Sequence, residues 1–281
     1  MRKNDNPEPL LCLPTVHTEN PPFAVLVSGT FTPRQVKVRW RSDQPSVPEH
    51  LRQAMDDYWR EQVALTSRSS FIFNGELCSL AGFEHGKNGL TLSLARTNYQ
   101  QLLYSNHIHE KRRSGPVPEF RSRALGVSTM LLSSDDQIIL IKRSARVGES
   151  PGKLDIIGGH IGPDEHAIDG VPDPFFAIQE EIVEEIGLHT HSQLACIGLL
   201  ETTVTRKPEL LFLHQSTLPT VAILRAAANC KSDEIAELLT IPNEQTDLTA
   251  FLHTRGHEFS PSALGCFSLY LKRLTQAGKT A

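Results

Sequence analysis

A helix with separate acidic and aliphatic faces, preceded by a glycine pair, constrains this chain more than any other sequence feature. Ile178, Ile182 and Ile186 recur at i, i+4 and i+8, the spacing of a helix face that packs into a core. The pattern predicts an amphipathic helix over residues 175–186, with its isoleucine face buried.

Three carboxylates project from a second face of this predicted helix. Glu181, Glu184 and Glu185 stand at i, i+3 and i+4, and like charges at these spacings destabilise a helix that offers them no partner. Mg²⁺ would make the arrangement favourable, because this hard ion prefers carboxylate and other oxygen ligands. A solvated acidic face is the alternative interpretation.

Glycines on both sides of the helix favour the metal site over the solvated face. Gly187 follows the last glutamate, where a helix commonly ends in a left-handed residue. Gly158 and Gly159 end a largely apolar stretch over residues 153–157, and they allow the backbone to approach the same cation.

This segment resembles the sequence box of the Nudix hydrolases, G-x5-E-x7-R-E-U-x-E-E-x-G-U, in which U is a bulky aliphatic residue. Gly159 and Glu165 match the first part, and residues 181–188 match the last part position by position. The resemblance implies a Mg²⁺-dependent or Mn²⁺-dependent hydrolase of phosphoanhydrides. It also implies that the three helix glutamates are catalytic and that they bind the metal together with Gly159.

The box departs from the family pattern in two ways. Residues 166–179 separate Glu165 from the position before Glu181, which is twice the usual spacing, and Glu180 replaces the box arginine. In the family this arginine pairs with the first glutamate, so Glu165 is kept here only as a supporting residue. Either another basic residue takes the place of the box arginine, or the carboxyl of Glu165 or Glu180 faces solvent. The candidate bases are Arg143, Arg146 and His160.

The whole chain resembles a narrower group, the uridine diphosphate glucose pyrophosphatases of this superfamily. Those proteins have an N-terminal α/β extension and a lengthened box without the arginine. The matching segments here are AMDDYWREQVA, LSLARTNYQQLLYSN, IKRSARVGESPGKLDIIGGH and SPSALGCFSLYLKRL. The resemblance implies hydrolysis of UDP-glucose or UDP-galactose to UMP and a sugar 1-phosphate.

Three further residues are candidates for substrate binding. Arg143 and Arg146 follow a predicted strand toward the glycine turn, and the planar guanidinium suits a diphosphate. Glu209, at the head of a later predicted strand, is a candidate proton acceptor, because family members use either a helix glutamate or a carboxylate from a later loop. An ordinary strand-edge glutamate is the alternative interpretation for Glu209.

Two domains are expected, divided by a polar and basic linker at residues 106–123. Residues 1–120 are predicted to form a small α+β domain, with a helix over residues 48–64 that bears two aromatic residues. Residues 121–281 are predicted to form an α/β/α sandwich with a mixed sheet. The elements expected in it include strands over residues 125–132, 137–143, 193–200, 209–215 and 220–224, and helices over residues 175–186, over residues 232–239 and from Pro261 onward.

Composition excludes several functional classes. The chain has 281 residues and a formal net charge of −4, so it lacks the basic character of a general nucleic-acid binder. No apolar run reaches bilayer length, and the N-terminus lacks the apolar stretch of a signal peptide. Five scattered cysteines without a CxxC pair favour reduced thiols and a cytoplasmic location. The expected partner is a small molecule, and the sequence leaves a homodimer open.

Three functional hypotheses remain from the sequence. The first is a pyrophosphatase for a nucleotide sugar. The second keeps the reaction but changes the substrate to ADP-ribose, coenzyme A or a dinucleotide. The third is a catalytically silent nucleotide-binding module, which the missing arginine favours and the intact helix carboxylates oppose.

Overall fold

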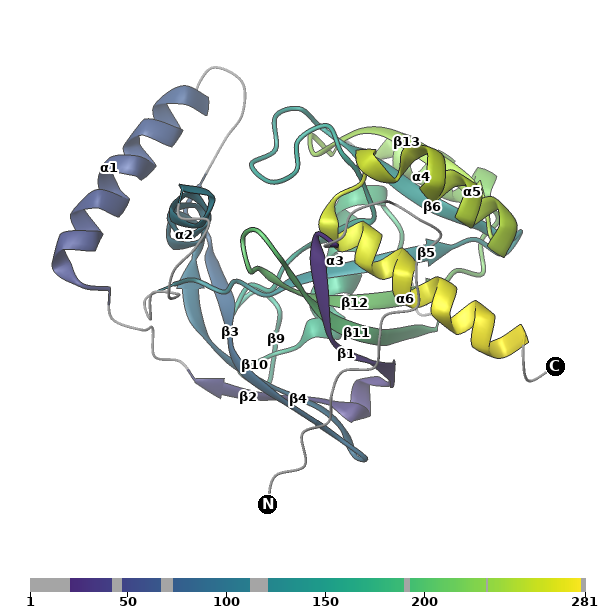
Figure 1. Cartoon of the computed structure of the whole chain (residues 1–281), viewed down its shortest axis with the longest axis horizontal. Helices are drawn as coiled ribbons and strands as arrows, with labels where there is room; N and C mark the ends of the chain where they lie inside the picture. Colours follow the sequence, from purple (N-terminus) through teal and green to yellow (C-terminus); the bar gives the residue numbers. More distant parts are fainter. Residues whose placement is uncertain are drawn as a thin grey trace.

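The computed structural model describes residues 21–41, 47–66, 73–111, 121–189, 193–230 and 232–278 (Figure 1). The strands are β1 (Phe23–Phe31), β2 (Val36–Arg41), β3 (Glu76–Gly86), β4 (Gly89–Asn98), β5 (Gly126–Leu132), β6 (Gln137–Arg143), β7 (Leu154–Asp155), β8 (Ile157–His160), β9 (Ala167–Ile168), β10 (Val171–Pro172), β11 (Leu194–Thr202), β12 (Pro208–Gln215) and β13 (Ile235–Pro242). The α-helices are α1 (Glu49–Thr66), α2 (Tyr99–Lys111), α3 (Pro174–Ile186), α4 (Thr220–Asn229), α5 (Gln245–Arg255) and α6 (Pro261–Gly278).

A mixed sheet forms the centre of the molecule, as the sequence predicts. Its order is β1-β11-β12-β5-β6-β13, with β8 paired to β5 and β7 paired to β6. The β12–β5 pair is parallel and the other pairs are antiparallel. This arrangement brings the glycine pair on β8 close to the start of β12, because both strands pair with β5.

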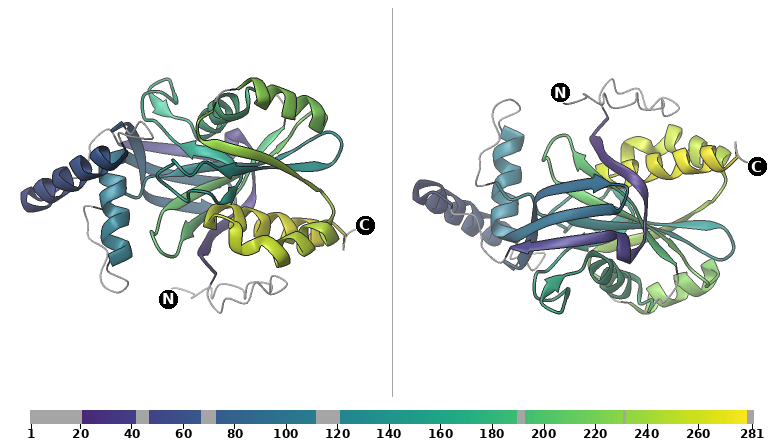
Figure 2. Two further views of the ribbon diagram at one scale, coloured as in Figure 1. Left: turned by 90° about the horizontal axis from the view of Figure 1, so that it is seen from above. Right: turned by 90° about the horizontal axis from the view of Figure 1, so that it is seen from below.

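Helices cover both faces of this sheet (Figure 2). On one face, Leu248 of α5 and Phe267 of α6 join a core cluster with Met130 and Leu211 of the sheet. On the other face, α3 and α4 pack against the sheet. Their buried residues include Ile182, Ile186, Ile223 and Ala227, which confirms that the isoleucine face of the box helix lies in the core.

The N-terminal segment contributes to the same core. Strand β1 pairs with β11 at one edge of the central sheet. The three-stranded sheet β2-β4-β3 packs its buried leucines against Val127 and against Phe175 of α3. Helices α1 and α2 extend to one side of the molecule (Figure 1). The two parts therefore share a core, and the division into residues 1–120 and 121–281 stays a prediction.

Two predicted elements are wrong. Residues 220–224 begin α4 instead of forming a strand, because Ile223 and Ala227, one helical turn apart, both pack into the cluster that holds Ile182 and Ile186. The helix predicted over residues 232–239 is instead β13, which pairs antiparallel with β6. The apolar residues of this segment fit a helix as well as a strand. The strand forms because its backbone pairs with the edge of β6, which would otherwise lack hydrogen bonds there.

The predicted linker is helical in its first part. Helix α2 continues to Lys111, and residues 121–123 are largely buried, while residues 112–120 lie outside the described ranges. The described cysteines, Cys78, Cys196, Cys230 and Cys266, are free thiols. Within the described ranges, no helix is both long enough and apolar enough to span a bilayer.

Candidate active site

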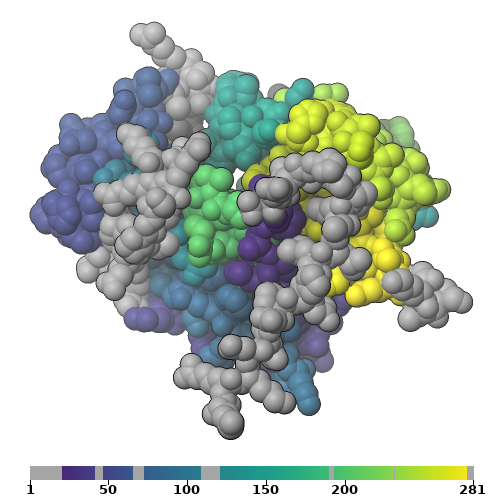
Figure 3. All heavy atoms as spheres, in the orientation of Figure 1, coloured from purple at the N-terminus to yellow at the C-terminus, as the bar shows by residue number. Residues whose placement is uncertain are grey.

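A pocket of about 820 Å³ lies between the N-terminal helices and the glycine turn of β8. In Figure 3 the green β11–β12 hairpin is visible between the blue N-terminal helices and the teal and yellow segments. The pocket walls include residues of α1 and α2, the loop after β6, the start of β12 and the box helix. The predicted site residues among these are Gly159, Glu181, Glu184, Arg143, Arg146 and Glu209.

The box helix is fixed at both ends by caps. Asp173 accepts hydrogen bonds from the backbone N–H groups of Phe175 and Phe176, at 2.7 and 3.1 Å. Gly187 adopts a left-handed conformation with φ of 70°, and its N–H donates to the carbonyl of Val183. These caps hold the acidic face of α3 in one orientation against the sheet.

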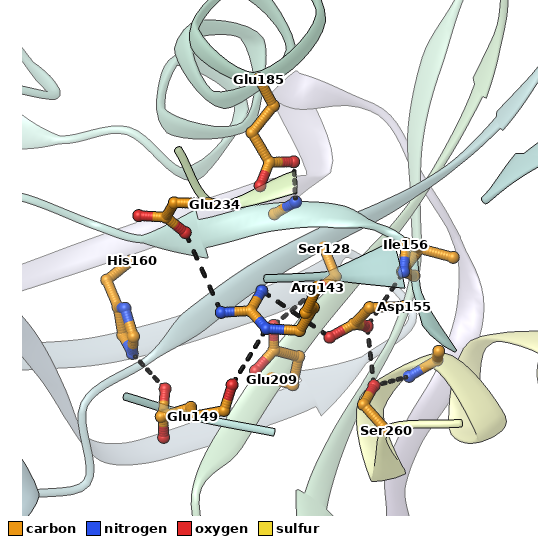
Figure 4. A network of polar contacts seen from close by, with 12 residues as sticks. Ser128, Arg143, Glu149, Asp155, Ile156, His160, Glu185, Glu209, Glu234 and Ser260 are labelled. Carbon is orange, nitrogen blue, oxygen red and sulfur yellow. Dashed lines mark hydrogen bonds and ion pairs between the residues drawn. The ribbon is translucent and has the colours of Figure 1, made fainter. Parts of the chain in front are cut away.

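The glycine pair brings the backbone of β8 against two helix carboxylates. A Cβ atom at Gly159 would lie 1.8 Å from Glu181 Oε1, so only glycine leaves room for this carboxylate. The N–H of Gly158 donates to Glu185 Oε2 at 3.2 Å, as Figure 4 shows. The backbone of the glycine pair therefore lies directly against the helix carboxylates.

The helix carboxylates lie in an environment that opposes their charge. Burial and then the charge of Glu184 raise the pKa of Glu181 to about 8. Burial and then the charge of Glu181 raise the pKa of Glu185 well above its usual range. The exposed Glu184 also has a raised pKa. Without a cation, this group is stable only when part of it is protonated.

A hard divalent cation fits these residues. Glu185 Oε1 is buried without a hydrogen-bond partner, and the donors around the glycine turn are carboxylate and carbonyl oxygens. Within the described ranges, no three His, Cys, Asp or Glu side chains are close enough together to hold a metal ion. The ligand set of Gly159, Glu181, Glu184 and Glu185 therefore stays a prediction.

A second charged group lies on the other side of the glycine turn. Lys207, whose side chain is only 13% exposed, donates to Glu149 Oε2 at 2.7 Å and lies 3.7 Å from Glu209 Oε2. Burial opposes the charge of Glu149, but Lys207 holds its pKa at about 2. Burial likewise opposes the charge of Lys207, but Glu149 raises its pKa. Lys207 and Glu149 thus form a charged pair at neutral pH.

Glu209 is buried in the central sheet, which corrects its interpretation as a strand-edge residue. The residue is 3% exposed, and Glu209 Oε1 accepts a hydrogen bond from Ser128 of the neighbouring strand. Glu209 Oε2 is buried without a hydrogen-bond partner, and burial raises the pKa of this carboxyl. Glu209 therefore has one carboxylate oxygen available at the pocket.

The two candidate arginines differ in their surroundings. Arg143 is largely buried at the centre of the network in Figure 4, where its Nε donates to the carbonyl of Glu149 at 3.0 Å. Its two terminal nitrogens lie 3.8 Å from Asp155 Oδ2 and 3.9 Å from Glu234 Oε2. These separations exceed hydrogen-bond distance, so both terminal groups retain donors for an anion. Arg146 is exposed at the pocket wall.

The comparisons with known proteins give partial sequence matches. No family model matches this chain. The uridine diphosphate glucose pyrophosphatase of Mus musculus is 29% identical over 132 residues, which are 39% of this chain and 43% of that protein. Nudix hydrolase 9 of Arabidopsis thaliana is 24% identical over 219 residues, which are 65% of this chain and 70% of that protein.

The chain belongs to the Nudix hydrolase superfamily. It spans less than half the length of the mouse pyrophosphatase that it matches. The solved structure of a MutT protein from Methanosarcina mazei gives a TM-score of 0.36 at 19% identity, covering 54% of this chain and 94% of that chain. A Nudix hydrolase from Nitrosomonas europaea gives a TM-score of 0.36 at 16% identity, covering 52% of this chain and 87% of that chain. The assignment rests on the sequence matches and the box, not on these TM-scores.

None of the three bases considered for the missing box arginine pairs with Glu165. Arg143 faces Asp155 and Glu234, and Arg146 is exposed. His160 is largely buried, with its Nε2 atom 3.5 Å from Glu149 Oε2, and burial lowers its pKa to about 3. The exposed Glu165 matches the other alternative, a carboxyl that faces solvent.

Sequence reasoning missed Lys207 and Glu149, two partly buried charged residues of this pocket, whose side chains are 13% and 22% exposed. Each lies in a connecting segment, where a charged residue usually reads as solvated surface. Their burial depends on three elements that meet only in the fold: the loop after β6, the β11–β12 hairpin and α2. Asn106 of α2 contributes a hydrogen bond of 3.4 Å to Glu149. The sequence offered one weak signal for Lys207, its position directly before Pro208 and Glu209 at the start of a predicted strand.

Proposed function

We propose that this protein is a divalent-metal-dependent pyrophosphatase acting on a nucleoside diphosphate sugar. UDP-glucose or UDP-galactose would be cleaved to UMP and the sugar 1-phosphate. The substrate class comes from similarity to the uridine diphosphate glucose pyrophosphatases, and the bond that is cleaved comes from membership of the Nudix superfamily.

One observation carries this proposal. The acidic box helix and the cationic residues Arg143 and Lys207 line the same pocket, on either side of one glycine turn. A diphosphate is an anion that needs both a bound cation and guanidinium or ammonium donors around it. A site with carboxylates alone would bind a metal without holding such a substrate.

The residues of the chain have distinct proposed roles. When bound, Mg²⁺ or Mn²⁺ supplies neutralisation of the diphosphate and a water of lowered pKa. Glu181, Glu184, Glu185 and the Gly159 carbonyl would hold that cation. Arg143, Lys207 and Arg146 would bind and orient phosphate oxygens.

Two kinds of carboxylate compete as the proton acceptor. The helix glutamates lie beside the glycine turn, and Glu209 offers, from the opposite side, a buried oxygen that accepts no hydrogen bond. Replacement of Glu209 by glutamine separates these roles, because it keeps the shape of the side chain and removes the proton acceptor.

The N-terminal part would complete the substrate pocket. Tyr58 of α1, together with Tyr99 and His107 of α2, lines the side of the pocket remote from the box. The domain boundary at residue 120, a cytoplasmic location, a small-molecule partner without nucleic acid or membrane, and a homodimer belong to the same proposal.

A panel of substrates tests the proposed reaction. UDP-glucose, UDP-galactose, ADP-ribose, coenzyme A and a dinucleotide would each be incubated with the protein and Mg²⁺, and released UMP and AMP would be quantified. We expect UMP from the two UDP-sugars, at a kcat/KM above that for AMP release from the other substrates. Preferential AMP release would change the substrate class. Release no faster than with the Glu184→Gln variant would favour the silent module.

A further inference from the structure

The lengthened box loop contains no lysine or arginine. Residues 160–173 connect the glycine turn to the N-cap of α3 and form the small β9–β10 hairpin. Glu165 in this loop lines the same pocket as Glu181 and Glu184 of the box helix. Glu180 adds a further like charge where the family has an arginine. The loop therefore approaches a group of carboxylates that repels it.

Two polar contacts from the N-terminal sheet hold this loop, and β10 within the loop also packs against β2. The carbonyl of Ile161 accepts a hydrogen bond of 2.8 Å from the N–H of Cys78 on β3. The carboxylate of Asp164, the residue before Glu165, pairs with both terminal nitrogens of Arg96 on β4, at 3.0 and 2.7 Å. The second contact is bidentate, a geometry that fixes both direction and distance.

Arg96 is held in place by its own sheet before it reaches the loop. It also donates to Glu76 at 3.0 Å, and its guanidinium lies 5.6 Å from the centre of the Trp40 ring. The Arg96 side chain is 25% exposed, whereas that of Asp164 is 76% exposed. The arginine is thus the fixed partner, and the loop is the part that the pair orients.

We propose that Arg96 is a positioning residue, which supplies from the N-terminal sheet the cation missing from the box and holds the box loop through Asp164. Neither Arg96 nor Asp164 lines the pocket, so neither touches the substrate. Their action passes through the backbone that joins Asp164 to Glu165 and to the glycine turn. The effect on turnover rests on the proposed function, whereas the effect on the loop does not.

A double-mutant cycle tests this proposal. The variants are Arg96→Met, Asp164→Asn and the double variant, with Arg96→Lys to restore the charge. Each single variant should lose about fivefold in kcat with little change in KM, the size that an exposed bidentate pair can supply. The double variant should lose no more than either single variant, because the second change has no contact left to remove. Arg96→Lys should recover part of the loss.

Hydrogen exchange provides a readout that needs no substrate. In Arg96→Met and Asp164→Asn, amide exchange in residues 160–168 should accelerate at least threefold, a local opening, while the midpoint of thermal unfolding stays close to that of the wild type. Arg39→Met is the matched control. Arg39 also pairs with a carboxylate within the same sheet, through both oxygens of Glu84, and among the described residues this pair makes no hydrogen bond or ion pair with the box loop.

The outcomes separate this proposal from the proposed function. Additive losses in the cycle, unchanged exchange in residues 160–168, or an equal effect of Arg39→Met would overturn the positioning role. If the wild-type protein hydrolysed none of the substrates, the proposed function would fail, and the exchange cycle alone would then decide the role of Arg96.

Discussion

The two groups of charged residues on either side of the glycine turn differ in how their buried charges are compensated. On the helix side, Glu181 and Glu185 are like charges whose pKa values are both raised. On the other side, Lys207 and Glu149 are opposite charges that support each other's ionisation. Figure 4 shows the separation, with Glu185 on one side of the strand and Glu149 on the other.

This difference indicates what each group can bind. Like charges in a buried setting become stable when a cation arrives, so the helix side is suited to a metal. A self-neutralised pair is already stable, so it can keep a fixed ammonium or guanidinium in place for an anion. The helix side of the pocket is therefore stabilised by binding a cation, whereas the Lys207–Glu149 side is stable without a ligand.

The largest expected effect concerns the helix carboxylates. Glu184→Gln or Glu185→Gln should lower kcat by roughly 10³-fold or more, because the cation contributes several kcal/mol to stabilising the transition state. Circular dichroism should show the wild-type fold. Glu180→Ala, on the same helix, should cost far less. Equal losses at Glu180 and Glu184 would mean that the register of the box is misread, and wild-type turnover by Glu185→Gln would refute the site.

The next effect concerns the self-neutralised pair. Lys207→Met should lower the free energy of unfolding by about 3–5 kcal/mol, because it leaves the Glu149 carboxylate buried without its partner. Urea denaturation measures this loss. The Lys207→Met/Glu149→Gln double variant should be more stable than Lys207→Met alone.

Arg255→Met is the surface control for this measurement. Arg255 pairs with Glu258, but both side chains are about one-third exposed, so its loss should cost at most about 1 kcal/mol. A Lys207→Met variant as stable as the Arg255→Met variant would show that the buried pair is not a structural element.

The third effect is a pH dependence of stability on the helix side, which develops gradually over several pH units. Folding raises the pKa of Glu181 to about 8, so between its ordinary value of 4.5 and 8 the unfolded chain loses this proton first. Stability of the metal-free protein should therefore fall as pH rises through this window, by up to about 4 kcal/mol between pH 5 and pH 8. Glu181→Gln should flatten this decline, and Mg²⁺ should oppose it at pH 8. Thermal unfolding in EDTA, compared between pH 5 and pH 8, measures the difference.

Glu149 should show a different pH dependence from that of Glu181. Its pKa is held at about 2, so its contribution to stability is present above about 4.5 and is lost only as the pH falls toward 2. Glu149→Gln should therefore leave the decline between pH 5 and 8 unchanged. If Glu149→Gln abolished this decline and Glu181→Gln did not, the assignment of the two groups would be reversed.

Local pattern accounts for the parts of the fold that were predicted. The box helix was identifiable because its isoleucine spacing, its glutamates and the glycine that ends it all lie within residues 178–187. The start of α6 was identifiable because Ser260 and Pro261 are an N-cap and first-turn pair. Residues 220–229 and 235–242 were misassigned because their patterns admit both a helix and a strand, and distant elements choose between these.

The sequence by itself determined the chemistry of the helix side, since all its carboxylates and the glycine turn lie within 31 consecutive residues, 158–188. Only the tertiary structure decided the rest of the pocket. Lys207, Glu149 and Arg96 come from separate segments, and a charged side chain gains its role only when folding removes water and brings its partner within reach. Burial and long-range pairing leave no periodic trace in the sequence.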